Sequence, residues 1–329
     1  MTMPGFSLDF SSLSAARLPD PGKSYDILVL GGGPAGLSAS IYAARKIVDL
    51  AVLTVNFGGQ MLDTSEIENY LGFTSIDAQE LAGRFKEHVT RFDIPIAQGV
   101  AVKKVRRDGD FFVADMEDAA AYRGRSIVYA TGMRHRRLGV PGEAELTGRG
   151  VAYCATCDAP FYRDKRVVVA GGGNSAFTSA RDLLKLNARV TIVNAAKGWQ
   201  ADPALIERVR EMGGAERLEG HRVVRIEGEG RVEAVVVQDT ATGDEKRLPA
   251  DGVFVDIGWV PNSDPLKGLA LLSPRGEVQI DCTSATSVPG IFAAGDVTTV
   301  PHKQIIISAG EGAKAALSAY AYLAGKGLL

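Results

Sequence analysis

Short apolar runs followed by glycine-rich turns divide the chain into repeating units. The segment 25–46, "YDILVLGGGPAGLSASIYAARK", starts with an apolar run, continues through glycines and ends in small residues at helical spacing. The segment 165–186, "KRVVVAGGGNSAFTSARDLLKL", repeats this pattern 140 residues further along. A short apolar run bounded by turn residues is typical of a buried strand, and the periodic segment after it is typical of a helix. We therefore predict two copies of a strand–turn–helix unit.

Further apolar runs predict the remaining strands and one long helix. After the first copy, a strand is expected at 50–55 and a strand running into a tight turn at 125–132; after the second, a strand at 188–194, a strand and turn at 252–262, and a strand ending in small residues and Asp296 at 289–301. The segment 303–325 is rich in small residues and predicts a long helix that packs closely against backbone or cofactor. Alternating strands and helices indicate an α/β fold. We expect two domains of three-layer ββα architecture, the second (137–262) inserted into the first (24–136 and 263–329), after an N-terminal leader (1–23).

Both predicted turns carry a dinucleotide-binding pattern. The first copy reads G-x-G-x-x-G and the second G-x-G-x-x-A, at Gly31, Gly33 and Gly36, and at Gly171, Gly173 and Ala176. In this context the first glycine makes the tight turn, the second lets a pyrophosphate approach, and the third small residue lets the helix pack on the sheet. The helix N-terminus then faces the phosphate charge. Both domains are therefore expected to be Rossmann-like dinucleotide-binding domains. Two such sites predict two dinucleotides, a flavin and a nicotinamide nucleotide.

Composition narrows the possible partners. The 329 residues fit two domains, and 46% of them are apolar. Lys and Arg number 37 against 39 Asp and Glu, so the near-neutral balance argues against a nucleic acid or membrane partner. Without a basic start followed by an apolar block, the N-terminus does not resemble a signal peptide, and we expect a cytoplasmic protein.

Two of the three cysteines form the pair Cys154-x-x-Cys157, followed directly by Asp158. A structural zinc site usually needs four Cys or His ligands. The third cysteine, Cys282, is far along the chain and the four histidines are scattered, so we predict no metal site. The spacing instead lets two sulfurs meet at the start of a helix, whose dipole favours a thiolate. Cys282 is expected to be an ordinary buried or strand cysteine.

The motifs together resemble a known family. The two glycine motifs, "ATG" at 130–132, "CATCD" at 154–158 and "GIFAAGD" at 290–296 resemble the low-molecular-weight thioredoxin reductases. The segments 57–73 and 298–319 look still more like the flavoprotein subunit of bacterial alkyl hydroperoxide reductase, without its N-terminal thioredoxin-like region. The resemblance implies a homodimeric FAD enzyme that reduces a disulfide in a small partner, here a separate thioredoxin- or glutaredoxin-like protein.

The resemblance also assigns cofactor-binding residues position by position. It places the FAD pyrophosphate at Gly31, Gly33, Ala35 and Gly36, the flavin at Gln60 and Asn69, the ribityl chain at Asp296 and the pyrimidine end of the ring at Gln304. It places the nicotinamide nucleotide phosphates at Gly173, Asn174, Ser175 and Ala176. The other expected cofactor-binding residues are Pro34, Ala130, Thr131, Gly132, Gly171, Asn194, Ile257, Gly258, Gly295, Lys303 and Ile305.

The family pattern implies a redox cycle through the cysteine pair. A hydride passes from the nicotinamide to the flavin, which then reduces the Cys154–Cys157 disulfide through Cys157. Cys154 attacks the partner's disulfide, and Asp158 supplies a proton to the departing thiolate. Because nicotinamide and cysteines visit the same flavin, the inserted domain is expected to rotate between two positions.

The choice of electron donor rests on the segment 193–203, "VNAAKGWQADP". Lys197 is the only cation there, a poor substitute for the arginines that hold a 2′-phosphate. Asn194 stands where an acid would bond the ribose 2′-hydroxyl. We therefore favour NADH as the donor, and leave open NADPH or loose use of either nucleotide, and poor use of both. The alternatives are an NADH oxidase, a reductase with a non-pyridine donor such as ferredoxin, and a non-enzymatic dinucleotide-binding protein; the intact cysteine pair argues against the first and the last.

Overall fold

A computed structural model of the protein describes residues 17–63, 66–213 and 215–329, so that residues 1–16 of the predicted leader lie outside the described part. The chain forms two units. The first combines the chain up to 57 with 84–131 and 263–329, and the second combines 58–83 with 132–262. The domain boundaries expected from the sequence differ in assigning 58–83 and 132–136 to the first domain, and they stay a prediction.

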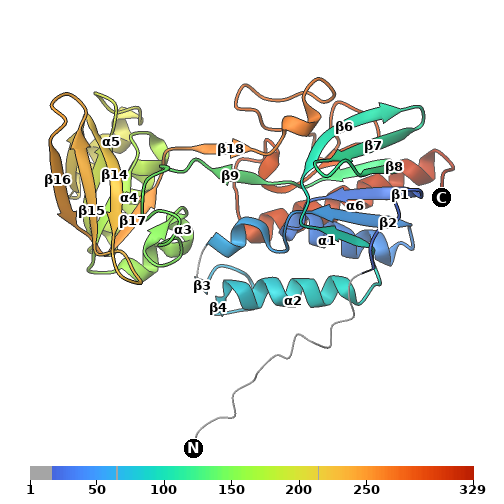
Figure 1. Ribbon diagram of the computed structural model, residues 1–329, viewed down its shortest axis with the longest axis horizontal. Helices are drawn as coiled ribbons and strands as arrows, with labels where there is room; N and C mark the ends of the chain where they lie inside the picture. Colours follow the sequence, from blue (N-terminus) through green and yellow to red (C-terminus); the bar gives the residue numbers. More distant parts are fainter. Residues whose placement is uncertain (1–16, 64–65, 214) are drawn as a thin grey trace, which may run out of the picture. The chain divides into compact units, whose positions relative to one another are not determined.

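The first unit is built on a seven-stranded sheet with the strand order β5-β2-β1-β8-β7-β6 and β19 beside β8 (Figure 1). Strands β1, β2, β5, β8 and β19 pair in parallel, and β6, β7 and β8 pair antiparallel. Its elements are β1 (Ser24–Leu30), α1 (Pro34–Arg45), β2 (Leu50–Thr54), β5 (Ile96–Gln98), β6 (Val102–Asp108), β7 (Phe111–Met116), β8 (Ala121–Tyr129), η4 (Asp264–Leu266), β19 (Ile291–Ala293), η5 (Gly295–Val297) and α6 (Ile305–Gly325). Helix α2 (Ala78–Thr90) leads into this unit from 58–83.

Strand β1 is buried on both faces, as its unbroken apolar run predicts. Ile27 and Val29 join the core under α1 and α6, whereas Leu28 and Leu30 join a second core that includes Phe112 of β7. These four β1 side chains have no exposed surface. Both faces of the central sheet are therefore covered within this unit.

Helices α1 and α6 lie side by side along one face of this sheet (Figure 1). Their contact is backbone to backbone at Gly312, which is buried: a Cβ atom at this position would collide with the carbonyl oxygen of Ala35. The small residues of 303–325 therefore have the packing role that the sequence predicts.

The second unit contains a five-stranded parallel sheet with the order β10-β17-β11-β12-β13 and a three-stranded antiparallel sheet, β14-β15-β16. Two short antiparallel pairs, β3–β4 and β9–β18, complete it. Its elements are η2 (Gly59–Asp63), β3 (Glu66–Ile67), β4 (Ile76–Asp77), β9 (Met133–His135), β10 (Val151–Ala152), α3 (Ala155–Asp158), η3 (Ala159–Tyr162), β11 (Arg166–Ala170), α4 (Asn174–Lys185), β12 (Arg189–Asn194), α5 (Pro203–Glu211), β13 (Ala215–Glu219), β14 (His221–Glu227), β15 (Ala234–Asp239), β16 (Glu245–Pro249), β17 (Gly252–Val255) and β18 (Trp259–Pro261).

Two cores separate the three layers of this unit. Val168 of β11 belongs to the core shared with the antiparallel sheet, which includes Val235 and Val237 of β15. Val169 belongs to the core under the helices, which includes Phe177 of α4. This arrangement confirms the three-layer ββα expectation, and both strand–turn–helix copies form as predicted. The antiparallel strands β6–β7 and β14–β16 were not predicted, and a second short strand, β18, follows the strand and turn that were expected over 252–262.

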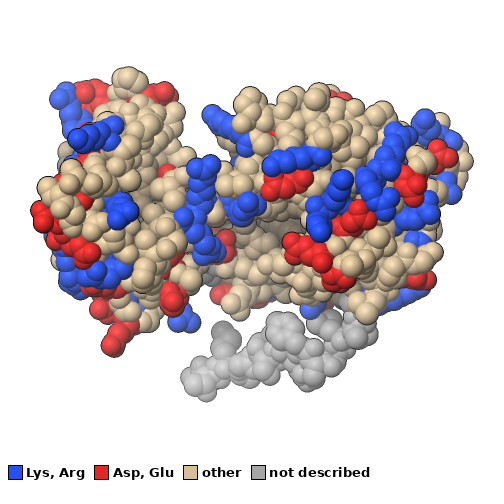
Figure 2. Space-filling model, turned by 45° about the horizontal axis from the view of Figure 1, so that its top comes forward, with Lys and Arg blue, Asp and Glu red and all other residues tan. Residues whose placement is uncertain are grey.

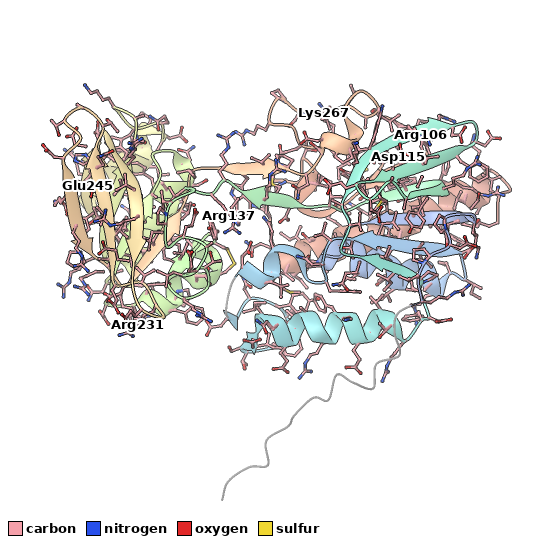
Figure 3. All side chains as sticks on the ribbon, viewed as in Figure 1. Arg106, Asp115, Arg137, Arg231, Glu245 and Lys267 are labelled. Carbon is pink, nitrogen blue, oxygen red and sulfur yellow. A yellow bond between two sulfur atoms is a disulfide. The ribbon has the colours of Figure 1, made fainter. Side chains whose placement is uncertain are left out.

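Positive and negative side chains are interspersed over the face shown in Figure 2. One such pair joins neighbouring antiparallel strands, Arg106 Nε of β6 to Asp115 Oδ2 of β7 at 3.0 Å (Figure 3). In the part of the chain that the structure describes, every helix is too short or too polar to cross a lipid bilayer.

We predict that Gly312→Ala destabilises the first unit by about 2 kcal/mol, because the added methyl group forces α1 and α6 apart. The measurement is urea denaturation. Gly310→Ala is the matched control on the same helix: nothing lies within 4 Å of its Cβ position. That variant should be neutral or up to about 1 kcal/mol more stable, since alanine favours helix. Equal effects of the two substitutions would contradict the packing role.

Candidate functional site

The first glycine loop lies at the carboxyl ends of β1 and β8. Gly31 has a φ of +121°, and a Cβ atom there would collide with the carbonyl oxygen of Ala130. Gly33 caps α1 in an extended conformation, and Pro34 follows at the first helical position. The loop therefore has the tight turn, the close backbone approach and the open helix start that a pyrophosphate needs.

A later segment of the chain meets the same loop. Gly295, which follows β19, has a φ of +74°, and its Cβ position lies 2.9 Å from Cβ of Ala35. Next to it, Asp296 Oδ1 accepts a hydrogen bond from Ser308 Oγ at 3.0 Å. Burial raises the pKa of Asp296, opposed by this hydrogen bond and by the charge of Lys303. The structure thus brings together expected FAD-binding residues from 31–36, 130–131 and 295–296.

Three of the expected cofactor-binding residues, Lys303, Gln304 and Ile305, lie where α6 begins. Lys303 Nζ donates to the carbonyl of Thr298 at 2.6 Å and pairs with Glu277 at 3.2 Å, both side chains being less than one-fifth exposed. Gln304 caps α6 and Ile305 is its first residue. Lys303 therefore anchors the turn before the helix.

The second glycine loop repeats the geometry of the first. Gly171 has a φ of +148°, and its Cβ position collides with the carbonyl oxygen of Asp256, directly after β17. Gly173 caps α4 in the extended conformation, with nothing within 4 Å of its Cβ position. Asn174 and Asp202 exchange hydrogen bonds of 2.7 and 3.1 Å, which tie the start of α4 to the start of α5. Both loops therefore fit the phosphates of a dinucleotide.

Asp256, a buried acid beside this second loop, was not predicted from the sequence. Its position within the apolar run "GVFVDIG" is the feature that could have indicated a buried carboxyl group. Among the described residues, Oδ2 has no hydrogen-bond partner, and burial raises the pKa of Asp256 to about 6, opposed by a hydrogen bond with Ser179 of α4. The carboxyl group therefore takes up its proton at a higher pH than an exposed aspartate does.

The end of β12, where a ribose is expected, is closed by its own loop. Asn194 is 6% exposed, and its amide nitrogen donates to Gly198 O at 2.7 Å and to Gln200 Oε1 at 3.4 Å. Its oxygen accepts from the backbone N–H of Ala196 at 3.3 Å. Both amide hydrogens of Asn194 thus form hydrogen bonds within the loop, which the sequence alone could not show.

The cysteine pair is at the start of a short helix, as predicted. Cys154 caps α3 and forms a disulfide with Cys157, with 5.3 Å between the Cα atoms; Figure 3 shows the sulfur–sulfur bond beside α3. Asp158 is only 6% exposed, and its backbone N–H donates to Cys154 O at 2.9 Å. The pair expected from the sequence is confirmed.

A tyrosine fixes the chain before the disulfide. The hydroxyl of Tyr153 donates to Glu143 Oε1 at 2.9 Å, and Glu143, 3% exposed, also accepts the backbone N–H groups of Leu138 and Gly139 at 2.9 and 2.7 Å. Burial raises the pKa of Tyr153 to about 12. No sequence signal marked Glu143.

A second tyrosine fixes the chain after the disulfide. Tyr162 packs edge-on against Phe254 of β17, with 5.1 Å between ring centroids. The ring occupies the space that a Cβ atom at Gly252 would need. Burial, with the charge of Asp158 as a smaller cause, raises the pKa of Tyr162 to about 12.

Two further expected residues lie in 58–83. Gln60 borders a cavity of about 500 Å³ that Ile257 also lines, and its Nε2 is buried with no hydrogen-bond partner among the described residues. Asn69 is exposed.

The expected residues Gly132 and Gly258 lie in the chain on either side of the five-stranded sheet. Gly258 follows Ile257 and has a φ of +103°. The carbonyl of Gly132 accepts a hydrogen bond from the backbone N–H of Asn262.

The prediction for Cys282 was wrong. This cysteine is exposed and lies in a turn outside any strand. The turn starts at Asp281, whose Oδ1 accepts the backbone N–H groups of Thr283 and Ala285. Cys282 lies within this turn, and its side chain is exposed.

Two dinucleotide loops and a dithiol–disulfide pair define an oxidoreductase that uses two nucleotide cofactors. Residues 25–316 match the family of pyridine nucleotide-disulphide oxidoreductases, and the chain belongs to this family. It is therefore an NAD(P)H-dependent oxidoreductase with FAD as its second cofactor, as the sequence predicts.

The chain is similar to named proteins over most of its length. It is 42% identical over 305 residues to an alkyl hydroperoxide reductase subunit of Pseudomonas putida, covering 92% of this chain and 58% of that one. It is 41% identical over 313 residues to an NADH dehydrogenase of Bacillus subtilis (strain 168), covering 95% and 61%. The thioredoxin reductase structure from Streptococcus pyogenes MGAS5005 shares 36% identity with a TM-score of 0.85, covering 92% and 99%. The chain thus spans about three-fifths of the two curated relatives.

We predict that Asp256→Asn changes the free energy of unfolding more favourably at pH 7.5 than at pH 4.5, by about 2 kcal/mol. Since the folded-state pKa is raised to about 6, the stability that the protonated acid contributes is present below its unfolded pKa and lost as the pH rises through about 6. Asparagine does not titrate. Urea denaturation at both pH values measures the difference.

Asp251→Asn is the control of opposite sign. The hydrogen bond and charge of Arg166 lower the pKa of Asp251, so its ionised form stabilises the fold above the unfolded pKa. This variant should lose stability at pH 7.5. A pH-independent effect of Asp256→Asn would contradict the buried-acid interpretation.

Proposed function

We propose that the protein is a disulfide reductase that passes electrons from NADH through FAD and Cys154–Cys157 to the disulfide of a small thioredoxin- or glutaredoxin-like protein. The observation that carries the proposal is the Cys154–Cys157 disulfide at the start of α3, in the same unit as the second glycine loop. The similarity to thioredoxin reductase and to the hydroperoxide reductase subunit supports it. The same resemblance supports a homodimer.

Cys154, Cys157 and Asp158 have separate roles in this reaction. The loop of Gly31, Gly33 and Gly36 would hold FAD, which when bound would supply the redox chemistry between the nicotinamide and the Cys154–Cys157 disulfide. The thiolate of Cys154 attacks one sulfur of the partner's disulfide, forming a mixed disulfide and releasing the other partner sulfur as a thiolate. Asp158, nearly buried beside the pair, gives that thiolate its proton. The thiolate of Cys157 then attacks Cys154 Sγ, which restores the internal disulfide and releases the reduced partner.

We expect Cys154→Ser to reduce disulfide-dependent NADH oxidation by more than about a hundredfold, because the attacking sulfur is gone. Reduction of the flavin by NADH should persist. The measurement pairs steady-state turnover with an oxidised thioredoxin against anaerobic bleaching of the flavin. Cys282→Ser, which removes an exposed cysteine outside the pair, should keep full turnover. Full turnover of Cys154→Ser would disprove the dithiol mechanism.

The second candidate function is an NADH dehydrogenase, in which the flavin passes electrons to an acceptor other than a disulfide. A 41% identical relative from Bacillus subtilis has that name, and this observation keeps the candidate. Such turnover does not need the cysteines. It should therefore survive Cys154→Ser with a quinone or dye acceptor, while thioredoxin reduction is lost.

We predict that NADH bleaches the flavin at a concentration about tenfold lower than NADPH does, because Lys197 alone cannot match the arginines that bind a 2′-phosphate. Anaerobic titration of the purified protein with each nucleotide measures this. Bleaching by neither, with dithionite still reducing the flavin, would eliminate the nicotinamide donor.

A further inference from the structure

Glu219 lies beside the expected ribose position, on the strand next to Asn194. It is the last residue of β13, and in the parallel pairing of β12 and β13 it is the register partner of Asn194. Its carboxylate reaches the loop that follows β12, where Oε2 accepts the backbone N–H of Gly198 at 2.9 Å. An acid is therefore present at this edge of the sheet, although it comes from the neighbouring strand.

The loop that Glu219 holds is attached to the glycine motif. The backbone N–H of Gln200 donates to Gly172 O at 2.8 Å, and Gln200 Nε2 donates to Gly198 O at 2.9 Å. The Asn194 side chain fills the space next to Gly172, where a Cβ atom would collide with it. The region after β12 thus has a defined position relative to the phosphate-binding loop.

Asn194 cannot provide the charge that discriminates between the two nucleotides. It is neutral, and both of its amide hydrogens are used by Gly198 and Gln200. Glu219, by contrast, is exposed and is bound to the loop through Oε2. In dinucleotide-binding folds an acid at this edge accepts the ribose 2′-hydroxyl and repels a 2′-phosphate.

Lys197 and His221, two positive or titratable side chains near this edge, also act on a second acid, Asp239. The backbone N–H groups of Ala241 and Thr242 are the main cause that lowers the pKa of Asp239, and the charges of His221 and Lys197 lower it further. His221 Nε2 lies 3.8 Å from Asp239 Oδ2. Among the described residues, neither side chain forms an ion pair with the Glu219 carboxylate, which is bound to the Gly198 N–H.

We propose that Glu219 sets the nucleotide specificity of this unit by rejecting a 2′-phosphate at the adenosine ribose. Two effects act together. The carboxylate repels the phosphate charge of about −1.5 to −2. It also occupies the Gly198 N–H, a backbone donor that a phosphate would otherwise use. A ribose 2′-hydroxyl suffers neither effect, because it can donate to the carboxylate. This inference rests on the proposed function, since it assumes that the second glycine loop binds a nicotinamide nucleotide.

The test measures binding of two adenosine fragments to the full-length, FAD-loaded protein by calorimetry. 5′-AMP carries the 2′-hydroxyl, and 2′,5′-ADP carries the 2′-phosphate. Glu219→Gln removes the charge while its amide oxygen can still accept from Gly198. We expect the affinity for 2′,5′-ADP to rise about tenfold, as for the loss of one charge about 5–6 Å from a phosphate in water. The affinity for 5′-AMP should change less than about twofold.

Glu216→Gln is the matched control. This acid is on the same strand and is also exposed, but it pairs with Lys246 Nζ at 3.1 Å instead of holding the loop. Its ratio of the two affinities should equal that of the wild type. An equal rise in Glu216→Gln, or an unchanged ratio in Glu219→Gln while 5′-AMP still binds, would overturn the assignment to Glu219 alone. Failure of the wild type to bind 5′-AMP would overturn the nucleotide site, and with it both the proposed function and this inference.

Discussion

One steric constraint recurs in both units, and the two cofactor loops depend on it. The first glycine of each motif, Gly31 or Gly171, presses against the carbonyl oxygen of the residue that follows the adjacent parallel strand, Ala130 or Asp256. No side chain fits there, and both glycines have a positive φ. This close approach lets the chain turn at the end of the strand, start the helix with an extended glycine cap, and leave helix N–H groups for phosphate. The strand order around each loop, β1 beside β8 and β11 beside β17, supplies the opposing carbonyl.

The two loops are alike in backbone and differ in the side chain that meets them. Ala130 follows β8 in the first unit, and its counterpart after β17 is Asp256. A buried carboxyl is costly when ionised. The second unit therefore carries a titratable group at a position where the first has a methyl group. The acid that we propose to select the nucleotide, Glu219, is placed instead at the exposed end of β13 and not within the glycine loop.

Local patterns predicted the parts of the molecule that short stretches of chain determine. The strand–turn–helix copies and the Cys154–Cys157 pair are encoded within 25–46, 165–186 and 154–158. The antiparallel strands β14–β16 were missed because their polar, exposed faces dilute the alternation along each strand. Cys282 was misplaced because its turn is determined by hydrogen bonds to Asp281. Asn194 and Glu219 show the general limit: a residue's type was visible, whereas its hydrogen-bond partners and its neighbour on the next strand exist only once the sheet forms.

Two tyrosines, Tyr153 and Tyr162, hold the two ends of the segment that contains the cysteine pair. Tyr153 is bound to Glu143 on one side, and Tyr162 is packed over Gly252 on the other. The eight positions between them include Cys154, Cys157 and Asp158, to which we assign the disulfide chemistry, while both tyrosines belong to the buried cores of this unit. Pro160 is exposed and can therefore be exchanged without disturbing either anchor, whereas Ala155 and Phe161 pack against the core under the helices. A new partner can thus be accommodated only through the exposed positions of this segment, because the two tyrosines and these apolar contacts hold the rest of it in place.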